Sequence, residues 1–307
     1  MPPQSDSSLM TSIPAPVIEL HAGWKDYLAL TKPRVISLLL FTTLATLYIA
    51  SDAHHPVTVF LFLAVMVGGY MSAGAANTIN MVIDRDIDAR MDRTSERPTV
   101  TQNISVLNAL LFALFLTVCS FALLTYSGGI LSAMMAMSGL LFYVFIYTLL
   151  LKRRTWHNIV IGGAAGAFPP LVGWAAVTHT LPLYAWYLFA IIFVWTPVHF
   201  WALALLIKED YARAKVPMLP VVKGDRYTVR QIGFYTFLTL LLTFLPVMQG
   251  YAGAFYLVSA VILNGFLVAG VLALYRKTER KQALILFKYS MIYLMLLFTA
   301  LAIDKHI

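Results

Sequence analysis

Three clusters of residues in this chain have types and spacing that could do chemistry. The first is the stretch NTINMVIDRDIDARMDRTSERP at 77–98. Within it, Asn80, Asp84, Asp88 and Asp92 follow one another every four residues. On a helix this spacing places the side chains on nearly one face, and like charges one turn apart repel unless a cation offsets them. Amide and carboxylate oxygens suit Mg²⁺, which prefers one or two carboxylates together with phosphate oxygens. We therefore predict Asn80, Asp84 and Asp88 as metal ligands.

An acidic interfacial loop, neutralised by its own arginines, is the alternative explanation of this stretch. Asp86 lies outside the acidic stripe formed by Asn80, Asp84, Asp88 and Asp92, and we expect it to pair with Arg85 or Arg90. The stretch directly follows an apolar segment, and ionisable groups at the edge of a membrane span are costly to keep. That setting favours the metal site over the loop.

A second polar cluster occupies WTPVHFWALALLIKEDYARAKVPMLPVVKGD at 195–225. Glu209 and Asp210 are candidates for a second set of Mg²⁺ ligands. Basic side chains around them are candidates for neutralising phosphate oxygens, namely Lys208, Arg213, Lys215 and Lys223. A positively charged loop after a membrane span is the alternative explanation. His199 lies inside the apolar run, about two helical turns before Lys208, Glu209 and Asp210.

The third cluster, YTLLLKRRTWHNIVIGGAAGAFPPLVGW at 147–174, combines basic and small residues. Lys152 and Arg153 either contact phosphate or mark the cytoplasmic side of the membrane. The run of Gly and Ala after Asn158 predicts close approach of neighbouring backbones. The stretch FPPLVG at 168–173 predicts a kink in the fifth span, and Pro197 predicts one in the sixth.

The elements that must position these clusters are long apolar segments. The chain is 60% hydrophobic and 12% charged, and its mean hydropathy is +0.78, unlike a soluble domain. A membrane-crossing helix needs roughly 20 apolar residues. We predict nine such spans, near 35–51, 57–80, 103–125, 128–150, 157–177, 183–207, 232–249, 252–274 and 284–303. The chain is therefore predicted to be an all-α polytopic membrane protein, with a disordered cytoplasmic tail at 1–23 and one domain at 24–307.

Basic residues set the predicted orientation. Every Lys and Arg except Lys305 lies before the first span, in alternate connections or, for Lys288, at the start of the last span on the same side, and the intervening connections contain none. By the positive-inside rule, the N-terminus and the three polar clusters are cytoplasmic. The basic residues that give the net charge of +8 are thus explained by membrane topology and by contact with anionic lipid headgroups. We therefore expect no nucleic-acid partner. The single Cys119 excludes a disulfide framework, and the absence of Lys and Arg from 1–23 favours a bacterial inner membrane over a mitochondrial precursor.

Magnesium and basic groups at a membrane surface indicate a substrate with a diphosphate head and an apolar tail, such as an allylic prenyl diphosphate. Metal and cationic side chains would stabilise the departing diphosphate. A dry cavity would protect the resulting allylic cation from water.

The acidic stretch resembles the first aspartate-rich motif of the intramembrane (UbiA-type) prenyltransferase superfamily. LKRRTWHNIVIGGAAGAFPPLVGWAA, HFWALALLIKEDYARAKVPMLPVVKGD and TKPRVISLLLFTT are similar to the branch that farnesylates protohaem IX, over about 24–303. The resemblance implies nine spans around a central cavity, with Mg²⁺ and farnesyl diphosphate at its cytoplasmic mouth. It implies haem B as the acceptor and haem O as the product, with a haem A synthase or terminal-oxidase assembly partner.

The resemblance also implies roles for individual residues. Asn80, Asp84 and Asp88 match the metal–diphosphate motif. Asp210 aligns with the first aspartate of the second motif, in which Ala214 replaces the usual partner and Glu209 is a candidate substitute. Candidates for holding the diphosphate are Arg93, Arg97, Lys152, Arg153, Lys208 and Lys223. Candidates for the haem pocket are Trp195, His199, Trp201 and Asn158. His199 could ligate or orient the haem iron, accept a proton, or only bond to a neighbouring helix, and it is also a catalytic candidate beside Asp84, Asp88 and Asp210.

Two other functions remain open at this point. One is prenyl transfer to an aromatic quinone precursor by a member of the same superfamily. The other is an ion-coupled transporter, although transporters usually carry charges near the middle of the bilayer. In this chain the charges gather at one face.

Overall fold

The computed structural model describes residues 22–307, and every regular element in that range is helical. The membrane-crossing candidates begin with α2 (Pro33–Ala50), α3 (Val59–Ile83), the combined α5 (Val106–Leu141) and η1 (Phe142–Leu151), and the combined α6 (Asn158–Gly162), α7 (Ala164–Ala167) and α8 (Pro169–Thr178). They continue with α9 (Leu183–Leu206), α12 (Asp225–Met248), α13 (Ala254–Arg276) and α14 (Arg280–Asp304). Shorter helices are α1 (Trp24–Thr31), α4 (Arg85–Asp88), α10 (Lys208–Arg213) and α11 (Leu219–Val222).

By length and composition, eight helical segments of residues 22–307 can cross a membrane, which confirms the predicted all-α polytopic class. Large apolar side chains on their outer faces are exposed, as on the first arm of α5, where Leu107, Leu111, Leu114 and Val118 form a stripe at helical spacing. A soluble protein rarely exposes such a surface, whereas a lipid bilayer covers it. The tail predicted at 1–23 lies outside the described residues, except for positions 22 and 23.

The predicted third and fourth spans form one helical segment of 46 residues, Val106–Leu151. Gly129 interrupts it with φ 79° and ψ 163°, a conformation that favours glycine. Ser120 Oγ donates to the carbonyl of Gly68 at 2.7 Å, and Ser72 Oγ donates to the carbonyl of Ala136 at 3.3 Å.

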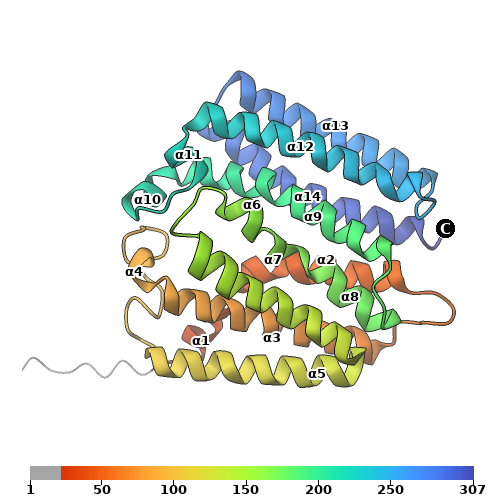
Figure 1. Ribbon diagram of the computed structural model, residues 1–307, viewed down its shortest axis with the longest axis horizontal. Coiled ribbons are helices and arrows are strands. Elements are labelled where there is room, and N and C mark those ends of the chain that lie inside the picture. The colour runs from red at the N-terminus through yellow and green to blue at the C-terminus, as the bar shows by residue number, and fades with distance from the viewer. Residues whose placement is uncertain (1–21) are drawn as a thin grey trace, which may run out of the picture.

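Gly68 and Ser72 are one turn apart in α3, but positions 120 and 136 would be about 24 Å apart on a straight helix. The chain therefore folds back at Gly129, and both arms pack against α3. Figure 1 shows the second arm, in yellow-green, returning toward the end where the first arm began.

The predicted fifth span is broken, as FPPLVG indicated, into α6, α7 and α8. Close approach of the small residues is also confirmed. A Cβ on Gly162 would lie 2.3 Å from the ring of Tyr147, so only glycine lets this segment meet η1. By contrast, α9 continues as one helix through Pro197.

The short helix α1 was not predicted, and its end places one important side chain. Lys32 links α1 to α2 in the left-handed conformation (φ 55°, ψ 63°), and Pro33 begins α2. Proline disfavours the α conformation in the residue before it, so the two helices cannot merge. The turn at Lys32 directs its side chain to α3, as described below.

The polar ends of the helices gather at one end of the bundle. Figure 1 shows α4, α10 and α11 at the left, whereas the C-terminus lies at the right. The three polar clusters of the sequence are thus brought to the same end.

Candidate metal and diphosphate site

The acidic stretch begins as the last turn of α3 and leaves the helix at Asp84, which caps it. Asn80, Asp84 and Asp88 are buried, with exposures of 3%, 0% and 2%. The stripe was expected to continue to Asp92, and this expectation is wrong. Because α4 ends at Asp88, the chain turns, and the side chain of Asp92 is 83% exposed.

A separate cationic side chain offsets each of the two buried carboxylates. Lys152, which follows η1, is ion-paired with Asp84, and its side chain is only 13% exposed. Arg97, in the loop after α4, donates from Nη1 to Asp88 Oδ2 at 2.5 Å. These two ion pairs offset the repulsion between the carboxylates of Asp84 and Asp88, which water cannot screen because both are buried.

The amide of Asn80 is oriented by three neighbours. Lys32 Nζ donates to Asn80 Oδ1 at 2.9 Å. Asn80 Nδ2 in turn donates to Asp84 Oδ2 at 2.7 Å and to Thr148 Oγ1 at 3.1 Å. Thr148 belongs to the π-helix η1, a form frequently found at functional sites.

Lys32 was predicted only as a topology charge, and its place beside Asn80 was missed. Burial, followed by the positive charges of Arg97 and Lys152, holds the pKa of Lys32 well below its usual range. Pro33 was the feature of the sequence that could have indicated this position, since a proline disfavours the helical conformation in the residue before it and so favours a turn at Lys32.

Arg153 connects the buried site to the surface. Its guanidinium donates to both oxygens of Asp86, at 2.8 and 2.6 Å, and to the carbonyl of Ile83 at 2.9 Å. The hydrogen bonds from Arg153 hold the pKa of Asp86 below its usual value. The expected pairing of Asp86 with Arg85 or Arg90 is therefore wrong, because the side chain faces the loop after η1 instead.

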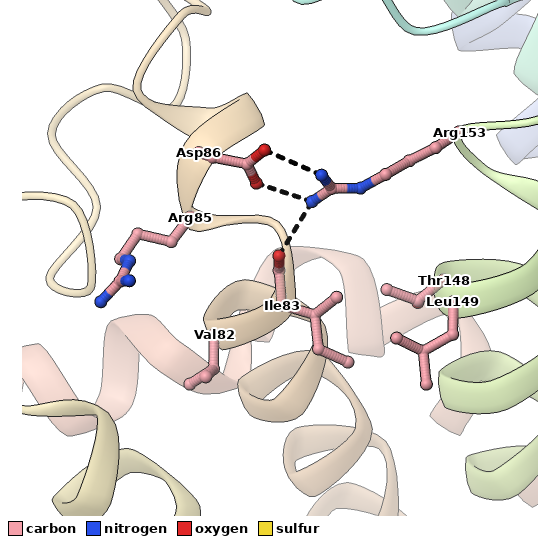
Figure 2. A pocket seen from close by; sticks show the side chains of 7 residues that line it. All are labelled: Val82, Ile83, Arg85, Asp86, Thr148, Leu149 and Arg153. Carbon is pink, nitrogen blue, oxygen red and sulfur yellow. Dashed lines mark hydrogen bonds and ion pairs between the residues drawn. The ribbon is translucent and has the colours of Figure 1, made fainter.

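Figure 2 shows this fork at the rim of an open groove of about 410 Å³. Its lining residues come from the end of α3, the start of α4, η1 and the loop after η1: Val82, Ile83, Arg85, Asp86, Thr148, Leu149 and Arg153. Nη2 of Arg153 also lies 3.6 Å from Asp84 Oδ1, so the same guanidinium stands between the groove and the buried carboxylate.

The donor set fits a hard cation. Asp84 Oδ1 is fully buried and accepts no hydrogen bond, an unusual state for a carboxylate oxygen. Within residues 22–307, no three Asp, Glu, His or Cys side chains lie close enough together to hold a metal ion. Mg²⁺ does not require three, because it uses one or two carboxylates with water and phosphate oxygens.

The second polar cluster lies beside the first and is joined to it through one arginine. Arg213 of α10 donates to Asp92 at 2.5 Å and is also paired with Asp210. Lys208 is paired with Asp225 at 2.7 Å. Glu209 and Lys223 are exposed and make no ion pair within the described chain. The use of Glu209 and Asp210 as metal ligands stays a prediction.

Tyr211 is a buried member of this region that the sequence did not single out. Burial raises the pKa of its hydroxyl to about 12, opposed by the nearby positive charges of Arg93 and Arg97. The phenol is therefore protonated near neutral pH and is available as a hydrogen-bond donor. Arg93, in the loop after α4, is exposed.

The candidate haem residues lie on α9 and α6. Trp195 is buried, and its ring stacks on that of His199 at a centroid distance of 4.7 Å. Trp201 and Asn158 are fully buried, and each has a polar atom with no hydrogen-bond partner: the Trp201 Nε1 and the Asn158 Oδ1. Trp201 packs edge-on against Tyr235 instead of stacking beside His199.

Sequence comparison identifies relatives along most of the chain. The sequence model of the UbiA prenyltransferase family matches residues 39–296. A protoheme IX farnesyltransferase of Thermus thermophilus is 62% identical over 284 residues, which are 92% of this chain but only 46% of that protein. One of Deinococcus radiodurans is 55% identical over 295 residues, covering 93% of this chain and 94% of that protein. The chain thus spans about half of the first relative and nearly all of the second.

Solved structures share the fold. A digeranylgeranylglyceryl phosphate synthase aligns with a TM-score of 0.74 at 18% identity, covering 92% of this chain and 98% of that one. A UbiA homologue of Archaeoglobus fulgidus, solved with dimethylallyl diphosphate (DMAPP) and Mg²⁺, aligns with a TM-score of 0.65 at 16% identity, covering 91% and 99%. At these identities the likeness establishes the helical fold.

Proposed function

This chain belongs to the UbiA prenyltransferase family and groups within it with the protoheme IX farnesyltransferases, and we propose that it transfers the farnesyl group of farnesyl diphosphate to a vinyl side chain of haem B. The product is haem O. The observation that carries this proposal is the buried Asn80–Asp84–Asp88 cluster, which joins a carboxylate oxygen that accepts no hydrogen bond to cations suited to a diphosphate.

Asp84 and Asp88 would hold Mg²⁺, with the amide of Asn80 orienting the first of them. When bound, Mg²⁺ supplies positive charge to the diphosphate oxygens and so lowers the barrier to breaking the allylic C–O bond. A magnesium requirement is supported by the Archaeoglobus fulgidus relative, which was solved with Mg²⁺. The buried Asp84 Oδ1, which accepts no hydrogen bond, is the chain's own support for it.

The charges of the site leave room for a diphosphate only with added positive charge. Arg97, Lys152 and Arg153 balance the three carboxylates Asp84, Asp86 and Asp88, while burial and the neighbouring cations hold the pKa of Lys32 well below its usual range. A diphosphate would add negative charge, which Mg²⁺ would offset and which would favour the charged form of Lys32. The buried pairs would then exchange carboxylate partners for phosphate oxygens.

The residues of the chain divide the reaction into two tasks. At the polar end, Lys32, Arg97 and Lys152 bind the diphosphate and stabilise it as it departs. The protonated hydroxyl of Tyr211 would be available to donate a hydrogen bond to the diphosphate. Toward the membrane, apolar side chains of the bundle exclude water, which would otherwise capture the allylic cation before the haem vinyl group attacks it.

The acceptor would lie deeper, along α9. Trp195 and His199 offer stacked rings at the level of the bundle interior, and Asn158 offers a free amide oxygen. Arg93, Lys208 and Lys223 lie at the polar mouth, where they would attract anionic substrates. Glu209 and Asp210 would supply further metal contacts from the second motif.

Membrane topology follows from the same arrangement. We propose nine crossings, because the 46-residue segment folds back at Gly129 and each of its arms is long enough to span a bilayer. The basic polar end would face the cytoplasm of a bacterial inner membrane, with the N-terminus on the same side. A single catalytic domain would cover 24–307, and a haem A synthase or oxidase-assembly factor would take the product.

The decisive experiment incubates purified protein with radiolabelled farnesyl diphosphate, Mg²⁺ and one acceptor at a time. We expect label in haem when haem B is present, and none in 4-hydroxybenzoate or a menaquinone precursor. Label in a quinone precursor but not in haem would overturn the proposal. Because the assay uses detergent-solubilised protein without a gradient, product formation also excludes an ion-coupled transporter as the explanation.

A further inference from the structure

A histidine inside the bundle is held on both faces and on one edge. His199 of α9 lies between two nearly parallel rings, with Trp195 at 4.7 Å and 13°, and Phe287 of α14 at 4.8 Å and 25°. Its Nδ1 lies 2.8 Å from Ser290 Oγ. Trp195 Nε1 donates to the carbonyl of Ser290 at 3.0 Å, so one residue of α14 anchors both rings. The imidazole therefore has a single orientation.

The hydrogen bonds of Ser290 determine which nitrogen carries the proton. A hydroxyl has one hydrogen to donate, and Ser290 Oγ donates it to the carbonyl of Phe287 at 2.7 Å. Toward His199, the same oxygen can only accept, so the Nδ1 of the imidazole must bear the hydrogen. An imidazole among apolar rings with no carboxylate partner is favoured in its neutral form. The lone pair is therefore on Nε2.

Nε2 of His199 has no hydrogen-bond partner within the described residues, and the residue as a whole is half-buried. This nitrogen is not among the fully buried unpartnered atoms of this range, so it keeps some accessible surface. A neutral histidine whose other N–H is held by a fixed acceptor is the usual arrangement of a metal-binding imidazole. Histidine is a common axial ligand of haem iron.

We infer that Nε2 of His199 is the axial ligand that holds the iron of the haem substrate, and that Ser290 is the positioning residue that keeps this nitrogen unprotonated and aimed. The inference rests on the proposed function, because haem is the acceptor there. It adds how the chain recognises the metal of its acceptor, so that an iron-free porphyrin would bind less tightly than haem.

The test titrates the full-length protein in nanodiscs with ferric haem, and in parallel with iron-free protoporphyrin IX. Optical spectra follow binding, and resonance Raman detects the iron–histidine bond. Wild-type protein is expected to show that bond and to prefer haem over the iron-free porphyrin. His199→Gly should lose both the bond and the preference, and added imidazole should restore the bond. Ser290→Ala should weaken haem binding by about tenfold or more, without an equal loss for the iron-free porphyrin.

Ser259→Ala is the matched control, since this exposed hydroxyl bonds only to the carbonyl of its own helix, at Phe255. It should bind both porphyrins as the wild type does. An unchanged iron preference in His199→Gly would overturn the inference, even if the wild type farnesylates haem. A wild type that binds haem through His199 but never farnesylates it would overturn the proposed reaction instead. Misfolding is recognised separately, because a misfolded variant would bind neither porphyrin and would not regain the iron bond with imidazole.

Discussion

Replacing Lys152 by Met tests whether the acidic stripe is held by cations from distant segments. Asp84 is fully buried, and Lys152 is its ion-pair partner at 13% exposure. Removing one member of a buried pair leaves an uncompensated charge and costs roughly 3–5 kcal/mol. Arg153 remains 3.6 Å from the other oxygen of Asp84, so we expect the lower end of this range, about 3 kcal/mol.

The double variant Lys152→Met, Asp84→Asn removes both charges together. Its cost should be clearly smaller than the sum of the two single changes, with a coupling of about 2 kcal/mol. Stability is measured by reversible unfolding in mixed detergent micelles with rising dodecyl sulfate. Arg154→Met is the control, because Arg154 is exposed and unpaired within the described chain, and its effect should stay within about 0.5 kcal/mol. Equal effects of the Lys152 and Arg154 variants, or additive effects in the double variant, would refute this reasoning.

Three further predictions concern the metal, the surface fork and the turn between the arms of α5. Asp84→Asn should lower farnesyl transfer by about 100-fold or more and raise the Mg²⁺ concentration needed for half-maximal activity, as measured by product formation across Mg²⁺ concentrations. Full activity with no change in magnesium dependence would contradict it. The hydrogen-bonded fork holds the pKa of Asp86 below its usual value, so the carboxylate stabilises the fold above the ordinary pKa of about 3.9, and this contribution is lost only as pH falls through the lowered value. Stability curves of wild type and Asp86→Asn should therefore run in parallel from pH 7 to about 4 and converge below it; convergence already near pH 6 would be inconsistent. Gly129→Ala should destabilise by about 1–3 kcal/mol, because its φ is 79° and a Cβ would lie 2.7 Å from His179 Nδ1. Gly265→Ala, in open space on a regular helix, should be neutral or stabilising in the same unfolding assay, and equal effects of the two changes would argue against a strained turn.

The sequence by itself determined the class of the protein and which segments carry its candidate reactive groups. Apolar segments of about 20 residues can satisfy their backbone in a bilayer only as helices, so the helices follow from local composition. The spacing of Asn80, Asp84 and Asp88 predicted that they form one group, and the structure buries all three, although α3 ends at Asp84 and Asp88 lies in α4. The motifs around them were specific enough to indicate the family, which the comparisons confirmed.

The tertiary structure decided which charges meet, because packing brings together residues that are far apart in the chain. Lys152 lies 68 residues from Asp84, and Lys32 lies 48 residues from Asn80. The sequence around Lys152 does not distinguish it from the other basic residues between the helices, and the proline after Lys32 indicates a turn but not the contact with Asn80. The ends of the helices are also decided by the folded backbone. Because α3 ends at Asp84 and α4 ends at Asp88, Asp88 is buried and Asp92 is exposed. The pairing of His199 with Ser290 across 91 residues arose only when α9 packed against α14.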